Sequence, residues 1–212
     1  DIGFSGGILD ASSLTTFVGA NDGFITKWYD QSGNALDATQ ATTTKQPQIV
    51  SAGTIITFNG KYAAQFDGSN DWMGTPSSAN YTAAGGEWSC FGVCKFDDDN
   101  VTRLVWDSDD NGTPKRLAQF MRNGGSGAVQ SIAFDTLGNA FTDDGGDAST
   151  NQVLLFAIRT ATTIEIYMND TSGGSTATTG TPATFTTVAT IGAFNSGTTA
   201  FMKGYIQEII HY

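Results

Sequence analysis

The stretch KWYDQSGNALDATQ at residues 27–40 carries the clearest structural signal in this chain. It begins with two large aromatic residues, Trp28 and Tyr29, and continues into the run DQSGN at 30–34. Side chains of Asp, Ser and Asn hydrogen-bond their own backbone in turns, and Gly and Asn tolerate positive φ. The stretch therefore predicts the end of a β-strand followed by a tight turn whose polar groups are satisfied within the turn itself.

Two interpretations of this turn are open. In one, the turn is architectural: its aromatic side chains belong to the core, and its polar atoms stabilise the bend. In the other, Trp28, Tyr29 and Asp30 line a ligand site, and Trp72, which follows FDGSND at 66–71, lies at the rim of the domain. Aromatic rings can stack on sugars, although the core is the default for tryptophans in strands. Asp, Ser and Asn side chains in such a run hydrogen-bond the backbone of the turn, and Gly permits its positive φ. We therefore favour the architectural interpretation.

Length and composition predict one all-β domain. The 212 residues suit a single β-sandwich, and the 26 glycines with only 15% charged residues favour many short strands joined by turns. The clearest hairpin signal is Asn59-Gly60, because type I′ turns need positive φ at both central positions. The expected strands are 24–29, 49–50, 54–58, 62–66, 72–73, 88–96, 102–106, 117–122, 129–134, 152–160, 163–169, 187–193 and 201–212.

Three further segments bear on how these strands are arranged. The segment LDASSLTTF at 9–17 is compatible with a short helix or with a loop. VLLFAI at 153–158 is apolar on both faces, as expected of a strand covered by a second sheet. The tract rich in Thr, Ser and Gly at 171–187 is expected to be a surface loop that runs into an edge strand.

The charge of the chain excludes some classes of partner. Its formal net charge of −11 argues against nucleic acids and anionic membranes, since phosphate contacts need a basic patch. No apolar run approaches the ~18 residues that span a bilayer, and no signal-peptide pattern is present. The first residue is Asp rather than Met, so we expect a processed chain, a fragment, or the ordered part of a longer protein.

Cys90 and Cys94 lie in WSCFGVCKF at 88–96, which alternates like a strand. Residues four apart on a strand face the same way but lie ~13 Å apart, whereas a disulfide needs Cα atoms within ~7 Å. We therefore predict two free, buried thiols, which fits folding in a reducing cytosol. A zinc site is not expected, because a strand cannot converge the two sulfurs and His211 is the only histidine.

A family resemblance rests on two separated sets of motifs. WYDQSGN at 28–34, DATQ at 37–40, Gln46-Pro47 and FDGS at 66–69 resemble the opening of laminin-G-like (concanavalin A-like lectin/glucanase) jelly-roll modules. FMKGYIQEIIHY at 201–212 resembles the F-x-G-x-I-x-E strand that closes them. The resemblance implies an antiparallel, two-sheet β-sandwich over residues 1–212, with 1–23 as a candidate N-terminal extension or linker.

The resemblance also implies a biological setting. Such modules occur in bacteriophage virion proteins and in bacterial surface proteins, and a similar YDQSGN run occurs in the catalytic domain of a fungal family of arabinofuranosidases. The expected role is a non-catalytic module of a phage fibre, tail or head decoration, folded in the host cytoplasm and displayed on the virion surface, or on a bacterial cell surface. It would bind host-surface glycans weakly, with many copies supplying avidity. The alternatives are a structural subunit that binds other virion proteins, and a glycoside hydrolase.

Catalysis is the least favoured of these functions. Glycoside cleavage generally needs two carboxyls ~5–9 Å apart, and the glucanases of this fold carry them in a run such as E-x-D-x-x-E, which this chain lacks. Only the YDQSGN turn matches the arabinofuranosidases, so no catalytic residue is assigned. Glu208 shares strand parity with Ile206 and Ile210, and a carboxylate on an apolar face must be paired, hydrogen-bonded or protonated. We expect a satisfied acceptor there, with a general acid as the alternative.

One acidic run is a candidate metal site. Its oxygen-bearing residues are Asp107, Asp109, Asp110 and Asn111, which together with Gly112 match the first half of an EF-hand calcium loop. The twelfth position is Ala118 instead of Glu, and the flanks look like strands, so the run is not an EF-hand. A solvated acidic hairpin is the favoured interpretation, and a rim calcium site, as the resembling modules often have, is the other. No other cofactor is expected.

Overall fold

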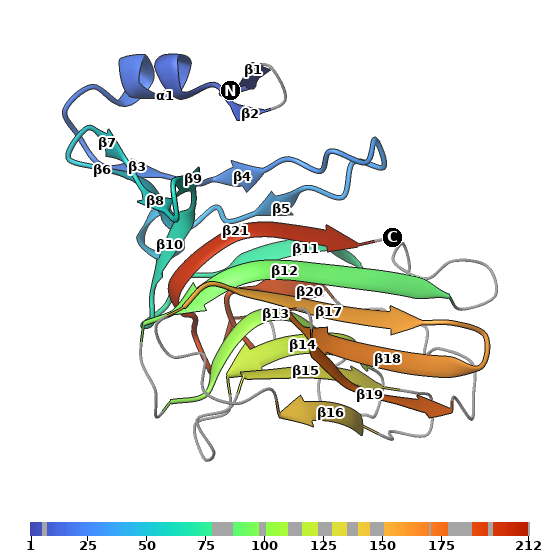
Figure 1. Cartoon of the computed structure of the whole chain (residues 1–212). Helices are drawn as coiled ribbons and strands as arrows, with labels where there is room; N and C mark the ends of the chain where they lie inside the picture. The colour runs from blue at the N-terminus through green and yellow to red at the C-terminus, as the bar shows by residue number, and fades with distance from the viewer. Residues whose placement is uncertain are drawn as a thin grey trace.

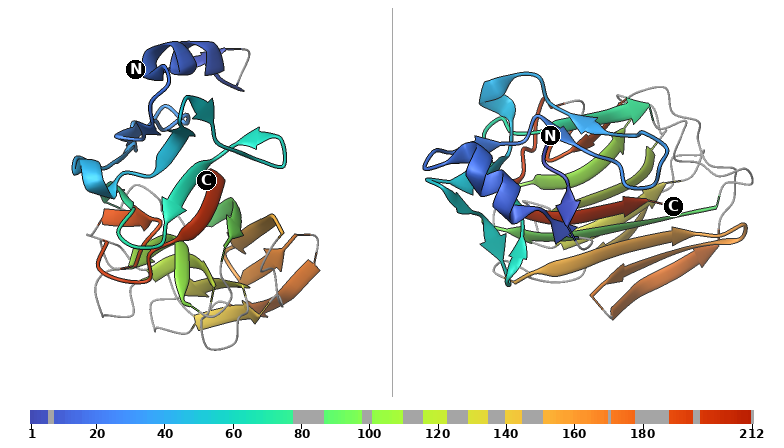
Figure 2. Two further views of the ribbon diagram at one scale, coloured as in Figure 1. Left: turned by 90° about the vertical axis from the view of Figure 1, so that its left-hand side faces the viewer. Right: turned by 90° about the horizontal axis from the view of Figure 1, so that it is seen from above.

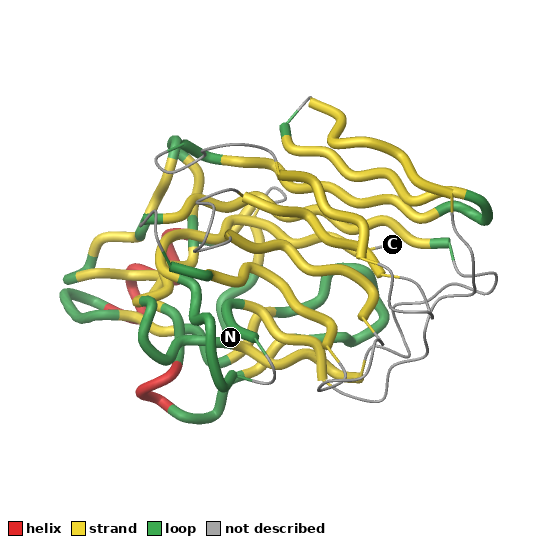
Figure 3. The backbone as a smooth tube through the Cα atoms, turned by 90° about the horizontal axis from the view of Figure 1, so that it is seen from below, coloured by secondary structure: helices red, strands yellow, loops and turns green. Residues whose placement is uncertain are grey.

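The computed structural model describes residues 1–5, 8–77, 87–97, 101–109, 116–122, 129–134, 140–144, 151–169, 171–177, 188–194 and 197–211. Most of the regular structure in these ranges is β-strand, arranged in two large antiparallel sheets that lie face to face (Figures 1 and 3). The all-β, two-sheet sandwich expected from the sequence is confirmed. Among the described residues, no helix is long and apolar enough to cross a membrane.

One layer is a nine-stranded sheet in the order β19-β18-β17-β12-β21-β10-β6-β3, with β7 paired to β6. Its strands are β3 (Gly23–Phe24), β6 (Gln48–Ser51), β7 (Thr54–Ile55), β10 (Ala64–Asp67), β12 (Trp88–Phe96), β17 (Val153–Arg159), β18 (Thr163–Met168), β19 (Thr171–Ala177) and β21 (Lys203–His211). The edge strand β19 is the first part of the Thr/Ser/Gly tract, so the surface loop expected there is wrong for residues 171–177.

The other layer is an eight-stranded sheet in the order β16-β15-β14-β13-β20-β11-β5-β4. Its strands are β4 (Lys27–Trp28), β5 (Ala38–Thr39), β11 (Met73–Ser77), β13 (Arg103–Asp109), β14 (Arg116–Arg122), β15 (Val129–Phe134), β16 (Ala140–Asp144) and β20 (Val188–Ile191). The remaining elements are the pairs β1 (Phe4–Ser5) with β2 (Ile8–Leu9) and β8 (Thr57–Phe58) with β9 (Lys61–Tyr62), helix α1 (Ala11–Val18) and the 3-10 turn Thr43–Lys45.

The N-terminal segment forms a helix where the sequence left helix and loop open. Asp10 caps α1: its carboxylate accepts hydrogen bonds from the N–H of Ser13 at 3.1 Å and from the hydroxyl of Ser13 at 2.6 Å. Leu14 is buried, whereas Phe17 is 81% exposed. The two views of Figure 2 place this helix at the outside of the sandwich, beyond the strands that follow it.

The expected strand at 24–29 is wrong in one respect, because it is two strands in different sheets. β3 pairs with β6 in the nine-stranded sheet, and β4 pairs with β5 in the eight-stranded sheet. Between them, the N–H of Ile25 donates to the carbonyl of Pro47, and the carbonyl of Thr26 accepts from the N–H of Gln40. The chain therefore crosses from one layer to the other immediately before the aromatic turn.

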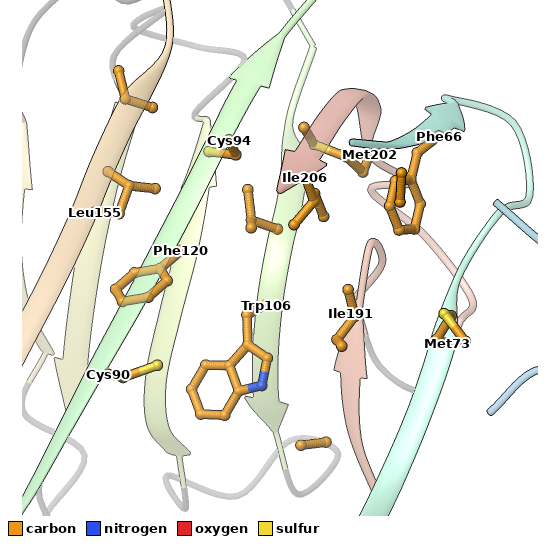
Figure 4. Close-up of a cluster of buried hydrophobic side chains, with 14 of the residues drawn as sticks. Phe66, Met73, Cys90, Cys94, Trp106, Phe120, Leu155, Ile191, Met202 and Ile206 are labelled. Atoms are coloured by element: carbon orange, nitrogen blue, oxygen red, sulfur yellow. The ribbon is translucent and has the colours of Figure 1, made fainter. Parts of the chain in front are cut away.

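The core fills the space between the two sheets (Figure 4). The largest fully buried side chains are Trp106, Phe66, Phe96, Phe120, Met73, Leu104, Leu155 and Met202. Cys90 and Cys94 are free and buried, as predicted. Both project from the core face of β12, where burial raises the pKa of each thiol far above its ordinary value. These thiols are therefore protonated and unreactive at neutral pH.

Strand β21 lies in the middle of the nine-stranded sheet, where it pairs with β12 on one side and with β10 on the other. Its register shifts between Val93 and Cys94, so Val93 pairs with Glu208 and Cys94 pairs with Ile206. This bulge moves Glu208 to the outer face, where it is exposed, while Ile206 stays in the core. The prediction that Ile206 and Glu208 share one face of the strand is therefore wrong. Glu208 is not a carboxylate on an apolar, buried face.

Candidate functional site

The outer face of the nine-stranded sheet carries apolar and aromatic side chains in cross-strand rows. On β12, even-numbered residues are buried and odd-numbered residues face outward. The register places Phe91 beside Phe156 of β17, and Phe156 beside Tyr167 of β18. In Figure 1 this face is turned toward the viewer, with β12, β17 and β18 in front of the other sheet. VLLFAI is thus apolar on both sides although only its core side is covered by the second sheet, which corrects the expectation from sequence.

The aromatic side chains of this face stack on one another. The ring centroids of Phe91 and Phe156 lie 4.0 Å apart with planes 15° from parallel, and those of Phe156 and Tyr167 lie 5.6 Å apart. The Tyr167 hydroxyl donates to the Glu165 carboxylate at 2.9 Å. Faces that stack on each other are not open to a ligand, so this row stiffens the sheet and borders the next feature.

Beside the aromatic row lies a depression of about 430 Å³, lined by Asn59, Val93, Asn151, Gln152, Leu154 and Asn169. Val93 and Leu154 pair in register on β12 and β17 and form an aliphatic floor. The four amide-bearing residues stand around it. They come from the β8–β9 turn, from the two residues before β17 and from the residue after β18.

A chain of side-chain hydrogen bonds orients these amides. Asn59 Nδ2 donates to Gln152 Oε1 at 2.7 Å, and Gln152 Nε2 donates to Gln207 Oε1. Gln207 Nε2 in turn donates to the backbone carbonyls of Phe58 at 2.7 Å and Lys61 at 3.2 Å. Because each amide has a distinct donor and acceptor end, this relay fixes which way each one points.

Three lining amides keep unused hydrogen-bonding groups. Asn59 Oδ1 and both ends of the Asn151 amide have no partner within the described part of the chain. Asn169 Oδ1 accepts from the N–H of Leu154 at 3.1 Å, which leaves its Nδ2 as a donor. The depression thus presents uncharged donors and acceptors above an aliphatic floor.

Turn geometry explains two of these asparagines. Asn59 and Gly60 have φ of 49° and 71°, so the β8–β9 hairpin has the predicted type I′ turn. Asn169 has φ of 55° at the turn from β18 to β19. Asn adopts positive φ more readily than other side chains. The same two positions therefore satisfy the backbone and supply amides to the depression.

The carboxylate of Asp30, a predicted ligand residue, forms its hydrogen bonds within its own turn. Its carboxylate accepts hydrogen bonds from the N–H and hydroxyl of Ser32 at 2.8 and 2.7 Å and from the N–H of Leu36 at 3.0 Å. Asp37 accepts from the N–H of Asp30 at 2.9 Å and pairs with the Lys27 ammonium at 2.7 Å. Burial acts to raise the pKa of Asp30, but the hydrogen bonds outweigh it and hold that pKa below its ordinary value.

The tryptophans of the predicted rim site are packed. Trp28 lies against the hydrophobic core, and the Tyr29 ring lies under the Lys27 ammonium at 4.6 Å. The Trp72 ring lies so close to Gly197 that a Cβ on that glycine would come within 2.3 Å of it. Trp28 lies in β4 and Trp72 immediately precedes β11, and both strands pair with β5, but no hydrogen bond or ring contact joins the two side chains among the described residues. Ligand binding by these residues stays a prediction.

We expect Asp30→Ala to lower the free energy of unfolding by about 2 kcal/mol, because three donors of the turn lose their acceptor. The matched control is Asn34→Ala in the same turn, an exposed side chain without a partner in the described ranges. It should change stability by less than about 0.5 kcal/mol. Urea denaturation followed by tryptophan fluorescence measures both, and equal midpoints for the two variants would contradict the architectural role of Asp30.

The candidate calcium residues are only partly within the described chain. Asp107 is buried, at 1% exposure, inside β13, and Asp109 is the last residue of that strand. The expected strand end at Trp106 is therefore wrong, and Asp107 does not lie on a solvated hairpin. Asp110 and Asn111 lie outside the described residues. Within the described residues, no three Asp, Glu, His or Cys side chains converge as metal ligands.

Comparison with solved structures identifies this architecture. A variant of a GH54 α-L-arabinofuranosidase soaked with 4-nitrophenyl α-L-arabinofuranoside matches with a TM-score of 0.68 at 20% identity, over 98% of this chain and 51% of that chain. Domain 4 of AbnA, a GH43 extracellular arabinanase from Geobacillus stearothermophilus in complex with arabinotriose, matches with a TM-score of 0.56 at 12% identity, over 91% and 93%. The chain shares their β-sandwich fold.

A third β-sandwich in the comparison is the CBM40 of a Ruminococcus gnavus IT-sialidase bound to α2,3-sialyllactose, with a TM-score of 0.53 at 9% identity, over 71% and 90%. The chain spans about half the length of the arabinofuranosidase chains that it matches. No protein-family model and no curated protein sequence matches it.

Sequence reasoning did not find the amide-lined depression. Its amide-bearing residues come from separate parts of the chain and belong to turns and strand ends, where asparagine is common for backbone reasons alone. One signal was present: VLLFAI is apolar on its outer side as well as its inner side. Leu154 is 37% exposed and continues the outward row of Phe91, Val93 and Phe156, and a contiguous apolar patch is more informative than a single exposed residue.

Proposed function

We propose that this protein is a non-catalytic, glycan-binding β-sandwich module and that it binds its ligand at the amide-lined depression. The observation that carries the proposal is the depression itself, with oriented amides around an aliphatic floor on a rigid sheet. Sites for small ligands are concave, with an apolar lining and a few placed polar groups. Two domains of similar fold, domain 4 of AbnA and the CBM40, are described in complex with oligosaccharides.

The chemistry of the lining favours binding over hydrolysis. Most glycoside hydrolases flank the scissile bond with two carboxyl groups. The six residues that line the depression in the described part of the chain include no carboxylate and no histidine. An amide can hydrogen-bond a hydroxyl group but does not act as a general acid or base at neutral pH, so these residues are suited to recognition.

We further propose display in many copies, on a phage virion surface or on a bacterial cell surface, which follows the resemblance of the two terminal motifs. A shallow site of this kind gives weak single contacts, and many linked copies convert them into strong attachment. A purely structural virion subunit is the second candidate, and it is favoured by the resemblance to inert modules of the same fold. We also propose a calcium ion at the rim of the domain, where it would assist glycan binding.

A glycan array probed with multimerised protein tests the proposal. We expect hits on a limited set of glycans, and repeating the array with a chelator shows whether calcium takes part. A blank array with a well-folded, multimerised sample would instead favour the structural subunit. Release of reducing sugar from plant or bacterial polysaccharides would contradict the non-catalytic assignment.

A further inference from the structure

We infer that the depression takes an uncharged saccharide, held by the side-chain amides and the aliphatic floor without a metal ion, a charged side chain or an aromatic stacking platform. This inference rests on the proposed glycan-binding function and specifies the class of glycan. It also differs from the tryptophan-based rim site that the sequence suggested, since it locates recognition on the opposite sheet.

The charges around the depression disfavour anionic sugars. Recognition of carboxylated or sulfated sugars normally uses Arg or Lys in charge-assisted hydrogen bonds. None of the six described lining residues is charged. The Lys95 ammonium, on the same face of β12, pairs with Asp97 and lies over the Phe58 and Tyr205 rings at 5.5 and 5.4 Å. Exposed Glu208, across from Val93, adds a negative charge beside the floor.

The unused polar groups fit hydroxyl groups. A sugar hydroxyl donates one hydrogen bond and accepts others, so it is satisfied by a site that offers both. Asn59 Oδ1 is an acceptor, Asn169 Nδ2 is a donor, and Asn151 offers one of each. The relay through Gln152 and Gln207 holds Asn59 in place before a ligand arrives. Such preorganisation reduces the entropy lost on binding.

The floor matches the less polar side of a sugar ring. Leu154 is 37% exposed and pairs with Val93, so the two side chains form a small aliphatic patch. The adjacent Phe91 and Phe156 rings stack on each other and cannot offer both faces to a sugar. Contacts to C–H groups therefore come from aliphatic carbon, which contributes through burial of apolar area. A volume of about 430 Å³ lies within the range of small-ligand sites.

The experiment compares neutral with carboxylated and sulfated oligosaccharides on an array, followed by calorimetric titration of the neutral hits. The test variant combines Asn59→Gly, which keeps the positive φ of the turn, with Asn151→Ala. We expect neutral oligosaccharides to bind, the double variant to lose at least about tenfold in affinity, and binding to be unchanged by a chelator or by high salt. Asn34→Ala is the matched control and should bind normally; thermal melting confirms that all variants fold.

Each other outcome overturns the inference in a distinct way. Hits confined to anionic glycans, or binding that a chelator abolishes, would overturn the uncharged, metal-free site while leaving the proposed function standing. Neutral glycans bound equally well by the double variant would move the site elsewhere on the molecule. A folded, multimerised protein that binds no glycan would overturn the proposed function, and this inference with it.

Discussion

Gly204→Ala is expected to lower the free energy of unfolding by more than about 4 kcal/mol, a large part of the roughly 5–15 kcal/mol by which native domains are typically stable. Gly204 has φ of 135°, and a Cβ there would lie 2.0 Å from the backbone carbonyl oxygen of Lys95 and 3.1 Å from Cα of Phe96. Both atoms belong to the backbone of β12, so no side chain can rotate away. β21 would have to separate from β12 and β10, its two neighbours at the centre of the sheet.

A second glycine separates this clash from backbone strain alone. Gly33, in the DQSGN turn, has φ of 85°, but a Cβ there would meet nothing within 4 Å. Gly33→Ala should therefore cost only the strain of positive φ, about 1 to 2 kcal/mol. Urea denaturation of the two variants and the parent protein measures the difference. A Gly204→Ala protein no less stable than Gly33→Ala would show that β21 does not approach β12 as closely as described.

Gly204 also shows what the sequence could predict. The F-x-G-x-I-x-E motif located the closing strand, and the structure gives the reason for its glycine, which is the close approach to β12. Strands with strict alternation, such as 88–96, were predicted with their observed bounds because their period of two reports burial directly. The rule of alternation fails after Gln207, because a β-bulge adds one residue to β21. Glu208 therefore faces outward instead of sharing the face of Ile206.

The candidate site was less predictable than the fold. Asn59, Gln152 and Gln207 join one hydrogen-bond relay, but hairpin folding and strand order bring them together, and neither leaves a pattern at those positions. The crossing of the chain between sheets at Ile25 and Thr26 was also hidden, because FITKWY at 24–29 is rich in aromatic and β-branched residues and contains no Gly or Pro to mark a break. By contrast, the polar content of the DQSGN turn did predict Asp30 as a local acceptor, because its partners lie within six residues.

The second large effect concerns two groups with shifted pKa values. Burial lowers the pKa of His211 from 6.5 to about 4; its ring stacks on that of Trp88, with centroids 6.2 Å apart, and lies tilted against that of Trp106 at 5.9 Å. Burial raises the pKa of Asp71 from 3.8 to about 6, although its carboxylate accepts from the N–H of Asp67 at 3.0 Å. One pKa unit corresponds to about 1.4 kcal/mol, so each shift represents up to about 3 kcal/mol.

The two groups act in opposite directions as the pH falls. For His211, the folded protein binds fewer protons than the unfolded chain between pH 6.5 and about 4, so its contribution to stability is lost on acidification. For Asp71, the folded protein binds more protons between about pH 6 and 3.8, so stability is gained on acidification and lost as the pH rises through 6. We therefore expect the parent protein to have a nearly flat stability profile between about pH 6.5 and 4.5.

Single substitutions separate the two contributions. Asp71→Asn removes the stability that Asp71 adds on acidification, so this variant should lose up to about 3 kcal/mol in its free energy of unfolding between pH 6.5 and 4.5. Near pH 7 the same substitution should make the protein more stable. His211→Phe keeps an aromatic ring against both tryptophans but cannot be protonated, so that variant should become more stable on acidification. The slope against pH is diagnostic because any packing change shifts stability equally at every pH. Urea unfolding across this pH range measures these slopes, and parallel profiles for the parent and both variants would show that neither group titrates in a buried environment.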